Sequence, residues 1–98
     1  MVVRKITERI FSIGTIDWDR RLFDSLIPLP DGTSYNSYLI RGTEKTALID
    51  TVDPSHEEEF ITNIVRAGCD RIDAIIINHA EQDHAGSLPI ILELFPGA

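Results

Sequence analysis

Alternating hydrophobic and polar positions along the chain predict strands first and helices later. From residue 6 to residue 16, isoleucines mix with β-favouring residues, which predicts a strand that ends near Gly14. Residues 35–40 and 46–50 are β-rich runs separated by a short polar segment that contains a glycine. Such a pair of runs is typical of an antiparallel hairpin.

Two later segments have the spacing of amphipathic helices. In the first, Ser55 and Glu58 form a capping box, and Gly68 follows the last turn as a C′ residue. Its apolar stripe consists of Phe60, Ile61, Ile64 and Val65. The second helix has Ser87 as its N-cap and ends at Pro96-Gly97. Its apolar side chains are Leu88, Ile91, Leu92 and Phe95.

Between the two predicted helices, residues 72–77 form a short, almost wholly apolar and β-branched run, which predicts a strand buried on both faces. Residues 17–34 contain two prolines and Asp31-Gly32, and therefore predict a long surface loop with one short helical turn near Leu22. The order of elements indicates an α/β (α+β) fold. Because a buried strand needs cover on both faces and only one helix follows it, we expect the chain to be part of a larger domain.

Composition places the chain among globular proteins of one domain. It has 98 residues, of which 43% are hydrophobic and 26% charged. Nine Lys and Arg against sixteen Asp and Glu give a net charge of −7, which opposes binding to nucleic acid or to an anionic membrane. The single cysteine, Cys69, gives no sign of an oxidising compartment, and no apolar run has the length of a membrane span. We therefore expect a cytoplasmic protein.

The residues with the clearest chemistry follow the apolar run 72–77. There, His79, Glu81, Asp83 and His84 fall within six positions, at the carboxyl end of a strand, where α/β folds place their sites. This spacing suits two metal ions a few ångströms apart, one held by His79 with Glu81 and the other by Asp83 with His84. Imidazole and carboxylate donors without thiolate favour iron, manganese or zinc over copper(I) or an iron–sulfur cluster.

The other candidate side chains are expected to have ordinary structural roles. His56 lies in the first turn of the first predicted helix, where exposure to solvent is expected. Cys69 has no His or Asn placed to activate it, so we expect it to pack as a small apolar residue.

The segment from His79 to His84 resembles the H-x-E-x-D-H motif of the flavodiiron proteins, also called A-type flavoproteins. Further segments look like segments of that family in the same order, namely residues 17–23, 32–40 and 45–52. Many members have His after the Phe of the Asp-Trp segment, whereas this chain has Asp24. Zinc hydrolases of the same superfamily typically have His at the position of Glu81, so the carboxylate there resembles the di-iron oxidoreductases.

The resemblance implies that residues 1–98 are the N-terminal part of one metallo-β-lactamase-like αβ/βα sandwich, incomplete in this chain. By resemblance, His79 and Glu81 bind one iron, and Asp83 and His84 bind the other. In the family, two further His and a bridging Asp complete the di-iron centre. A flavodoxin-like domain with FMN follows, and it is absent from these residues.

The same resemblance implies an oxidoreductase that takes part in electron transport and reduces dioxygen to water or nitric oxide to nitrous oxide. Its partners would be a rubredoxin-like or flavin/deazaflavin electron donor and a second subunit in a head-to-tail homodimer. The loop 17–34, with Trp18 and the Arg20-Arg21 pair, is predicted to face that second subunit.

Two alternatives remain open at this point. One is a dinuclear zinc hydrolase with the metallo-β-lactamase fold, and the other is an inactive truncated fragment. We expect residues 1–98 alone to be inactive and to bind metal weakly, because four candidate ligands give each of two metals only two.

Overall fold

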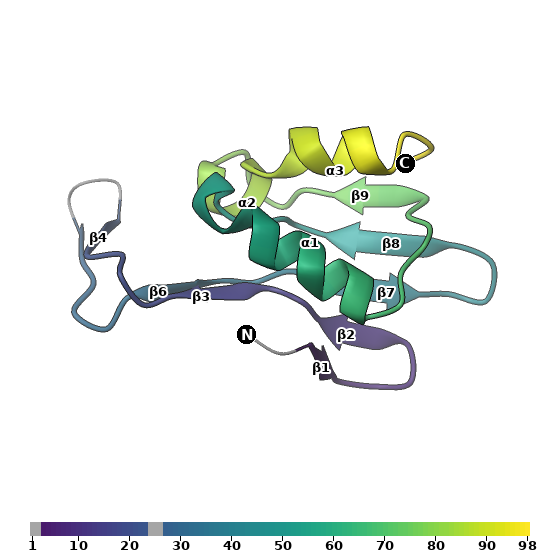
Figure 1. The fold of residues 1–98 in the computed structure, drawn as a ribbon, viewed down its shortest axis with the longest axis horizontal. Coiled ribbons are helices and arrows are strands. Elements are labelled where there is room, and N and C mark those ends of the chain that lie inside the picture. The colour runs from purple at the N-terminus through teal and green to yellow at the C-terminus, as the bar shows by residue number, and fades with distance from the viewer. Residues whose placement is uncertain (1–2, 24–26) are drawn as a thin grey trace.

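The computed structural model describes residues 3–23 and 27–98, which form a five-stranded sheet, an extended segment and a small set of helices (Figure 1). The extended segment, residues 15–23 and 27–35, is called the arm below. The sheet has the strand order β1-β2-β7-β8-β9. Its strands are β1 (Arg4–Lys5), β2 (Ile10–Ser12), β7 (Tyr38–Arg41), β8 (Thr46–Ile49) and β9 (Ala74–Ile76). All neighbours are antiparallel except β8 and β9, which are parallel. The mixture of helices and sheet confirms the predicted fold class.

The predicted hairpin is present as β7 and β8. Tyr38 pairs with Ile49 and Arg41 with Thr46, so the polar segment between the two strands makes the turn. The chain then crosses the sheet through the 3-10 helix η1 (Pro54–His56) and α1 (Glu57–Arg66) and returns as β9 beside β8. A parallel pair needs such a crossover, and the helix makes it.

Helix α1 ends as predicted but begins differently. At its C-terminus Gly68 has a φ of 72°, and the N–H of Gly68 and of Cys69 bond to the carbonyls of Val65 and Ile64, which is a Schellman motif. At its N-terminus the expected Ser55–Glu58 capping box is wrong. Asp53 instead caps η1 by accepting hydrogen bonds from Ser55 N and Oγ, because the extra turn of 3-10 helix places the cap two residues earlier.

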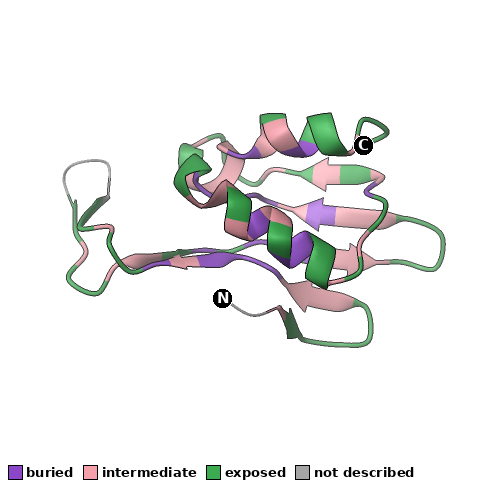
Figure 2. Cartoon of the chain, viewed as in Figure 1, coloured by how far each residue is buried: buried purple, intermediate pink, exposed green. Residues whose placement is uncertain are grey.

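One core cluster joins the sheet to both longer helices. Phe60 and Ile64 of α1 meet Leu39 and Leu48 of the sheet, together with Ile91 of α3 (Leu88–Leu94). Figure 2 shows this buried side of α1 where it crosses the sheet. The predicted stripe is partly wrong: Val65 is 68% exposed, and Asn63 is buried, where its side chain donates to the carbonyls of Ile13 and Gly14.

The opposite face of the sheet is apolar but is not buried in the described part of the chain. Successive side chains of a strand point to opposite faces of the sheet. The residues on either side of Leu39, Leu48 and Ile75 therefore point away from the core cluster. They are Tyr38, Ile40, Ala47, Ile49, Ala74 and Ile76. Each of them is half-buried or exposed. This surface is called the outer face below.

The strand expected over residues 72–77 is shorter and more exposed than predicted. β9 covers three residues, lies at the edge of the sheet and leaves Ile76 50% exposed. Only Ile72, which precedes the strand, is fully in the core. The prediction of burial on both faces is therefore wrong for this chain, since no strand follows β9 in the sheet and nothing described covers the outer face.

The single strand expected over residues 6–16 is divided into β2 and β3 (Thr15–Asp17), and β1 precedes this range. Thr7 Oγ accepts from the N–H of Arg9 and Ile10, which makes a turn between β1 and β2. Gly14 then lets the backbone pass so close to the Tyr35 carbonyl that a Cβ would collide with it. This close approach separates β2 from β3 and moves the chain from the sheet into the arm.

The loop expected over residues 17–34 contains short strands that form two separate two-stranded sheets. β3 pairs with β6 (Thr33–Tyr35), and β4 (Leu22–Phe23) pairs with β5 (Ile27–Pro28). The helical turn expected near Leu22 is wrong, because Leu22 pairs with Pro28 in a strand. Asp24 lies outside the described residues. In Figure 1 the arm projects well beyond the edge of the five-stranded sheet.

The C-terminal helices follow β9. A single turn, α2 (Gln82–Ala85), was not predicted, and it precedes α3. Ser87 stands at the N-cap position of α3, but its Oγ donates to the Val52 carbonyl instead of capping the helix. Among the described residues, no helix has the length and apolar character that a membrane span requires.

Candidate metal centre

The four residues singled out from the sequence lie together beyond the carboxyl ends of β8 and β9. His79 follows β9, and Glu81 is in extended conformation just before α2. The single turn of α2 then brings Asp83 and His84 back towards His79. Without that turn the side chains of adjacent residues would diverge.

These four side chains form two contacting pairs. His79 Nε2 is 2.8 Å from Glu81 Oε1, and His84 Nε2 is 3.6 Å from Asp83 Oδ2. The rings of His79 and His84 meet edge to face, with centroids 5.6 Å apart. His79 is the most exposed of the four, with 58% of its side chain accessible, so the cluster opens to solvent. The structure thus brings together the residues that the motif grouped.

Asp50 is a candidate site residue that the sequence motif did not mark. It follows β8 directly, it is 5% exposed, and one of its oxygens lies 2.9 Å from His84 Nδ1. The backbone N–H and the side-chain amide of Asn78 donate to its two oxygens at 2.8 and 3.1 Å. Its φ of 59° is in the left-handed region that Asp tolerates better than most residues. Asp50 therefore holds the imidazole of His84 by Nδ1, so Nε2 is the nitrogen that a metal ion would use.

The electrostatics of this contact have opposite effects on its two partners. Burial acts to raise the pKa of Asp50, but the hydrogen bonds from Asn78 and from His84 outweigh it and hold that pKa below its ordinary value. The hydrogen bond with Asp50 raises the pKa of His84, against a smaller opposing effect of burial. The carboxylate of Asp50 is consequently charged at neutral pH and makes the imidazole of His84 more basic.

The backbone beside Asp50 supports α2 from below. Thr51 donates from both its N–H and its Oγ to the carbonyl of His84, at 2.7 Å in each case. The N–H of Ser87 in turn donates to Thr51 Oγ. His84 is therefore fixed through its main chain as well as through its ring.

The donor set fits hard or borderline metal ions, but it is incomplete. Imidazole and carboxylate groups suit iron, manganese or zinc. Across residues 3–23 and 27–98, no group of three or more His, Cys, Asp or Glu is arranged to hold one metal ion by itself. Each pair offers two ligands, whereas even a catalytic zinc site usually has three from the protein.

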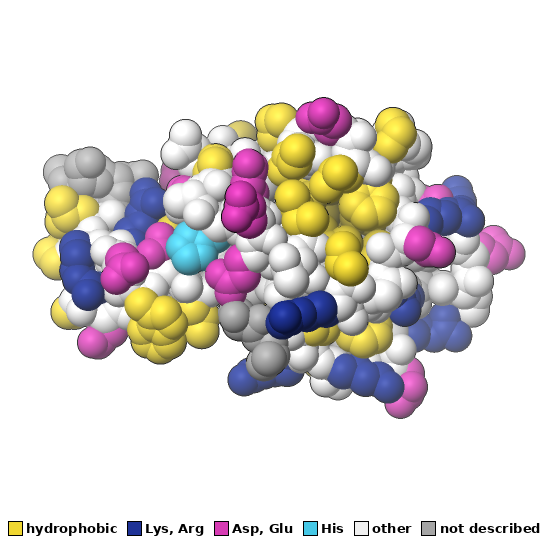
Figure 3. Space-filling view, in the orientation of Figure 1, with side chains coloured by type: hydrophobic (Ala, Val, Ile, Leu, Met, Phe, Trp, Pro, Cys, Tyr) yellow, Lys and Arg dark blue, Asp and Glu magenta, His cyan; other side chains and the backbone are white. Residues whose placement is uncertain are grey.

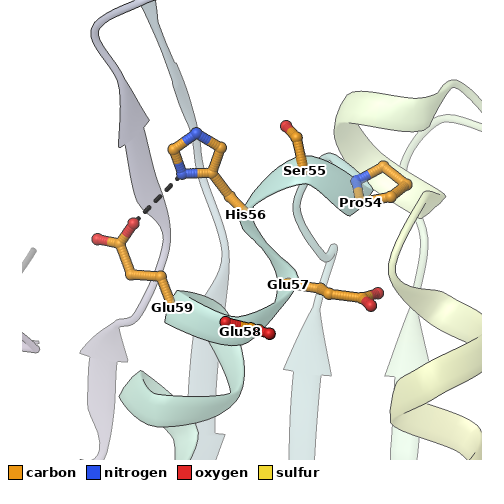
Figure 4. Close-up of a pocket in the computed structure, with 6 residues that line it drawn as sticks. All are labelled: Pro54, Ser55, His56, Glu57, Glu58 and Glu59. Atoms are coloured by element: carbon orange, nitrogen blue, oxygen red, sulfur yellow. Dashed lines mark hydrogen bonds and ion pairs between the residues drawn. The ribbon is translucent and has the colours of Figure 1, made fainter.

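The two remaining candidates, His56 and Cys69, have their described contacts with residues outside this cluster. His56 is not exposed as predicted: its side chain is 23% accessible, its ring nitrogens face Asp17 and Glu59, and its ring packs on Tyr35. Figure 4 shows a pocket lined by residues 54–59, in which His56 and Glu59 are turned towards each other. Cys69 is half-buried against the core, and burial raises the pKa of its thiol, as expected for a packing residue.

Comparison with known families gives this geometry a context. The model of the metallo-beta-lactamase superfamily matches residues 30–98, which is more than half of the chain and includes the whole cluster. The chain belongs to this superfamily. Within it, the relatives and solved structures at substantial identity are flavodiiron proteins, which confirms the resemblance stated above.

Two relatives and one solved structure illustrate this similarity. The flavo-diiron protein FprA2 of Clostridium acetobutylicum is 43% identical over 94% of this chain. The anaerobic nitric oxide reductase flavorubredoxin of Vibrio vulnificus is 44% identical over 93%. The structure of rubredoxin oxygen:oxidoreductase from Desulfovibrio gigas superposes with a TM-score of 0.87 at 38% identity over 96%. The chain spans only 23%, 19% and 23% of these three proteins.

Proposed function

We propose that this chain is the N-terminal part of the di-iron domain of a longer flavodiiron-type oxidoreductase, called the parent below. The parent would reduce dioxygen to water or nitric oxide to nitrous oxide, with electrons that reach the irons from FMN in a flavodoxin-like domain. The proposal draws on the flavodiiron relatives, whose names include a nitric oxide reductase and an oxygen oxidoreductase.

One observation in the structure carries the proposal. Two histidines, each in contact with its own carboxylate, meet ring to ring at 5.6 Å where two strands end. One of the carboxylates is Glu81, a hard oxygen donor that adds negative charge and so favours iron over a zinc-bound hydroxide. This pairing supports a two-metal centre with a redox role.

The residues of this chain would act by holding and orienting the metals. His79 and Glu81 would bind one iron, and Asp83 and His84 the other. A pair of ferrous ions held there would supply two electrons to a small diatomic molecule. Asp50 keeps the Nδ1 side of His84 occupied, so that Nε2 faces the centre. The exposed side of His79 leaves an entrance for a small substrate. The ligands still required would come from beyond this chain.

Exposed apolar surfaces support the view that this chain is one part of a larger assembly. The outer face of the sheet would be covered by the second half of the sandwich. On another side, Val65, Leu92 and Leu94 are exposed, where hydrophobic side chains gather over α1 and α3 in Figure 3. Contiguous apolar surface of this kind marks contacts with other chain segments or subunits.

The arm would face the second subunit of a head-to-tail homodimer. Its side chains Trp18, Leu22 and Ile27 are 65%, 50% and 55% exposed, so Trp18 does not anchor the arm to the sheet. Exposed aromatic and aliphatic side chains beside arginines suit a protein interface. A rubredoxin-like or flavin/deazaflavin donor in the cytoplasm would supply the electrons.

Metal content and turnover of the parent test this function. Anaerobically purified parent should contain about two irons per chain, given a two-metal centre, and one FMN, and should consume dioxygen or nitric oxide with a reduced flavoprotein or rubredoxin donor. The His79→Ala and His84→Ala variants should lose iron and turnover while keeping FMN. Glu93→Ala, which removes an exposed carboxylate of α3 outside the cluster, is the control and should keep both. Zinc without flavin, together with hydrolytic activity, would contradict the proposal.

A further inference from the structure

Arg20, which follows β3 in the arm, joins the arm to the segment that follows β8. One guanidinium nitrogen, Nη1, donates to Asp53 Oδ2 at 3.1 Å and to the hydroxyl of Tyr35 at 3.3 Å. The same tyrosine hydroxyl donates to Asp17 at 2.7 Å. The Asp53 side chain is 8% exposed, so its ion pair with Arg20 is largely shielded from water.

Asp53 lies at one end of a short buried segment, and the other end lies at the candidate metal centre. Residues 50–53 are each no more than 6% exposed. Along this segment Asp50 holds the ring of His84, Thr51 holds its carbonyl, and the Val52 carbonyl accepts from Ser87 at the start of α3. Four consecutive residues therefore connect the arm to α2 without an exposed link.

Packed segments of this kind transmit displacement because they have little room to absorb it. The positive φ of Asp50 adds to the constraint, since few neighbouring backbone conformations are open to a residue there. Removal of the guanidinium would leave the buried Asp53 carboxylate with Ser55 as its one remaining side-chain partner among the described residues. A buried carboxylate that loses its counter-charge moves towards water.

We propose that Arg20 is a positioning residue for His84, acting through the buried segment 50–53. The Arg20 cation fixes Asp53, which fixes the chain direction at Asp50 and with it the orientation of the His84 ring. A protein surface bound to the arm would thereby stiffen or relax one ligand of the candidate centre. This inference rests on the proposed metal centre, but its first readout requires no metal.

The neighbouring arginine provides a matched control. Arg21 lies on the same arm and carries the same charge, but its Nη1 donates to the Trp18 carbonyl, within the arm itself. In metal-free parent labelled with ¹⁵N-histidine, Arg20→Ala should broaden or shift the ring signals of His84, whereas Arg21→Ala should leave them unchanged. Arg20→Lys, which keeps the cation, should restore most of the wild-type signal. Asp53→Asn removes the charge that Arg20 pairs with and should have the same effect on the His84 signals as Arg20→Ala. It serves as the second test if the Arg20→Ala variant folds poorly.

Ferrous iron affinity supplies the second readout. Arg20→Ala should weaken it about three- to tenfold, less than a directly contacting residue would. In an Asp50→Asn background the further loss should be small, because both changes act on His84 along one route. Equal effects of Arg20→Ala and Arg21→Ala on the His84 signals, or additive losses of affinity in the double variant, would overturn the inference. If wild-type parent bound no iron, the proposed function would fail, while the ring signals would still decide whether Arg20 positions His84.

Discussion

Replacement of Asp50 tests whether the buried carboxylate beside His84 builds the candidate centre. Asp50→Asn keeps the side-chain size and the tolerance of a positive φ, so it removes the charge with little backbone strain. Asp50→Ala removes in addition the acceptors used by Asn78. The two variants therefore separate the effect of charge from that of local folding.

The structure sets the size of the expected effects. Asp50 is 5% exposed and accepts from Asn78 twice and from His84 once. Loss of a hydrogen bond to a charged group costs about 1.5–3 kcal/mol, and loss of a carboxylate behind a ligating histidine weakens metal binding about 10- to 100-fold. Asp50→Ala should destabilise the protein further, since an alanine at positive φ costs about 1–2 kcal/mol more.

The assay compares ferrous iron affinity and the free energy of unfolding for wild-type parent and the two variants. Asp73→Asn is the control, because Asp73 also accepts from a backbone N–H, that of Thr46, but at the opposite end of β8. We expect Asp73→Asn to alter stability without altering iron affinity. If Asp50→Asn bound iron as tightly as wild type, the orientation of His84 by Asp50 would have no part in metal binding.

Three further predictions concern the arm, the close approach at Gly14 and the outer face. Burial acts to raise the pKa of Asp17, but hydrogen bonds led by that of Tyr35, with the nearby His56, hold it below its ordinary value. The charged Asp17 therefore stabilises the protein above the pKa of an unfolded Asp, and this stabilisation is lost as pH falls through the lower folded pKa. If the unfolding free energy of the parent is measured with denaturant from about pH 7 to about pH 3, Asp17→Asn should make its fall at acid pH less steep. Gly14→Ala should cost about 1–3 kcal/mol because its Cβ meets the Tyr35 carbonyl, whereas Gly97→Ala, with open space around it, should leave the unfolding free energy unchanged. The isolated 98-residue chain should self-associate in analytical ultracentrifugation through its outer face and the edge of β9, and Ile76→Lys should reduce that association; a monomeric wild-type chain would contradict this.

Local patterns were sufficient for the elements whose cause is local. The β7–β8 hairpin follows from two β-rich runs around a polar turn, and the end of α1 follows from Gly68, which supplies the positive φ that the Schellman motif requires. The separation of β2 from β3 at Gly14 and the pairing of β3 with β6 were not predicted. They depend on contacts with residues about twenty positions away, such as the approach of Gly14 to Tyr35.

The candidate site divides in the same way. The alternation of His and carboxylate after an apolar run marked His79, Glu81, Asp83 and His84, and one turn of helix brings them together. Asp50 had no such local mark. In the pattern it is only the last residue of a predicted strand, because its contact with His84 joins positions 34 apart in the chain.

What the sequence determined by itself is therefore the chemistry and the short-range geometry: an α/β layering, a hairpin, two amphipathic helices and a set of imidazole and carboxylate donors at a strand end. Tertiary structure decided which charges face one another. The parallel pairing of β8 with β9 places Asp50 beside Asn78 and His84, and the arm places Arg20 on Asp53. Such contacts arise only when strands and turns far apart in sequence pack against each other, so the spacing of residues along the chain does not predict them.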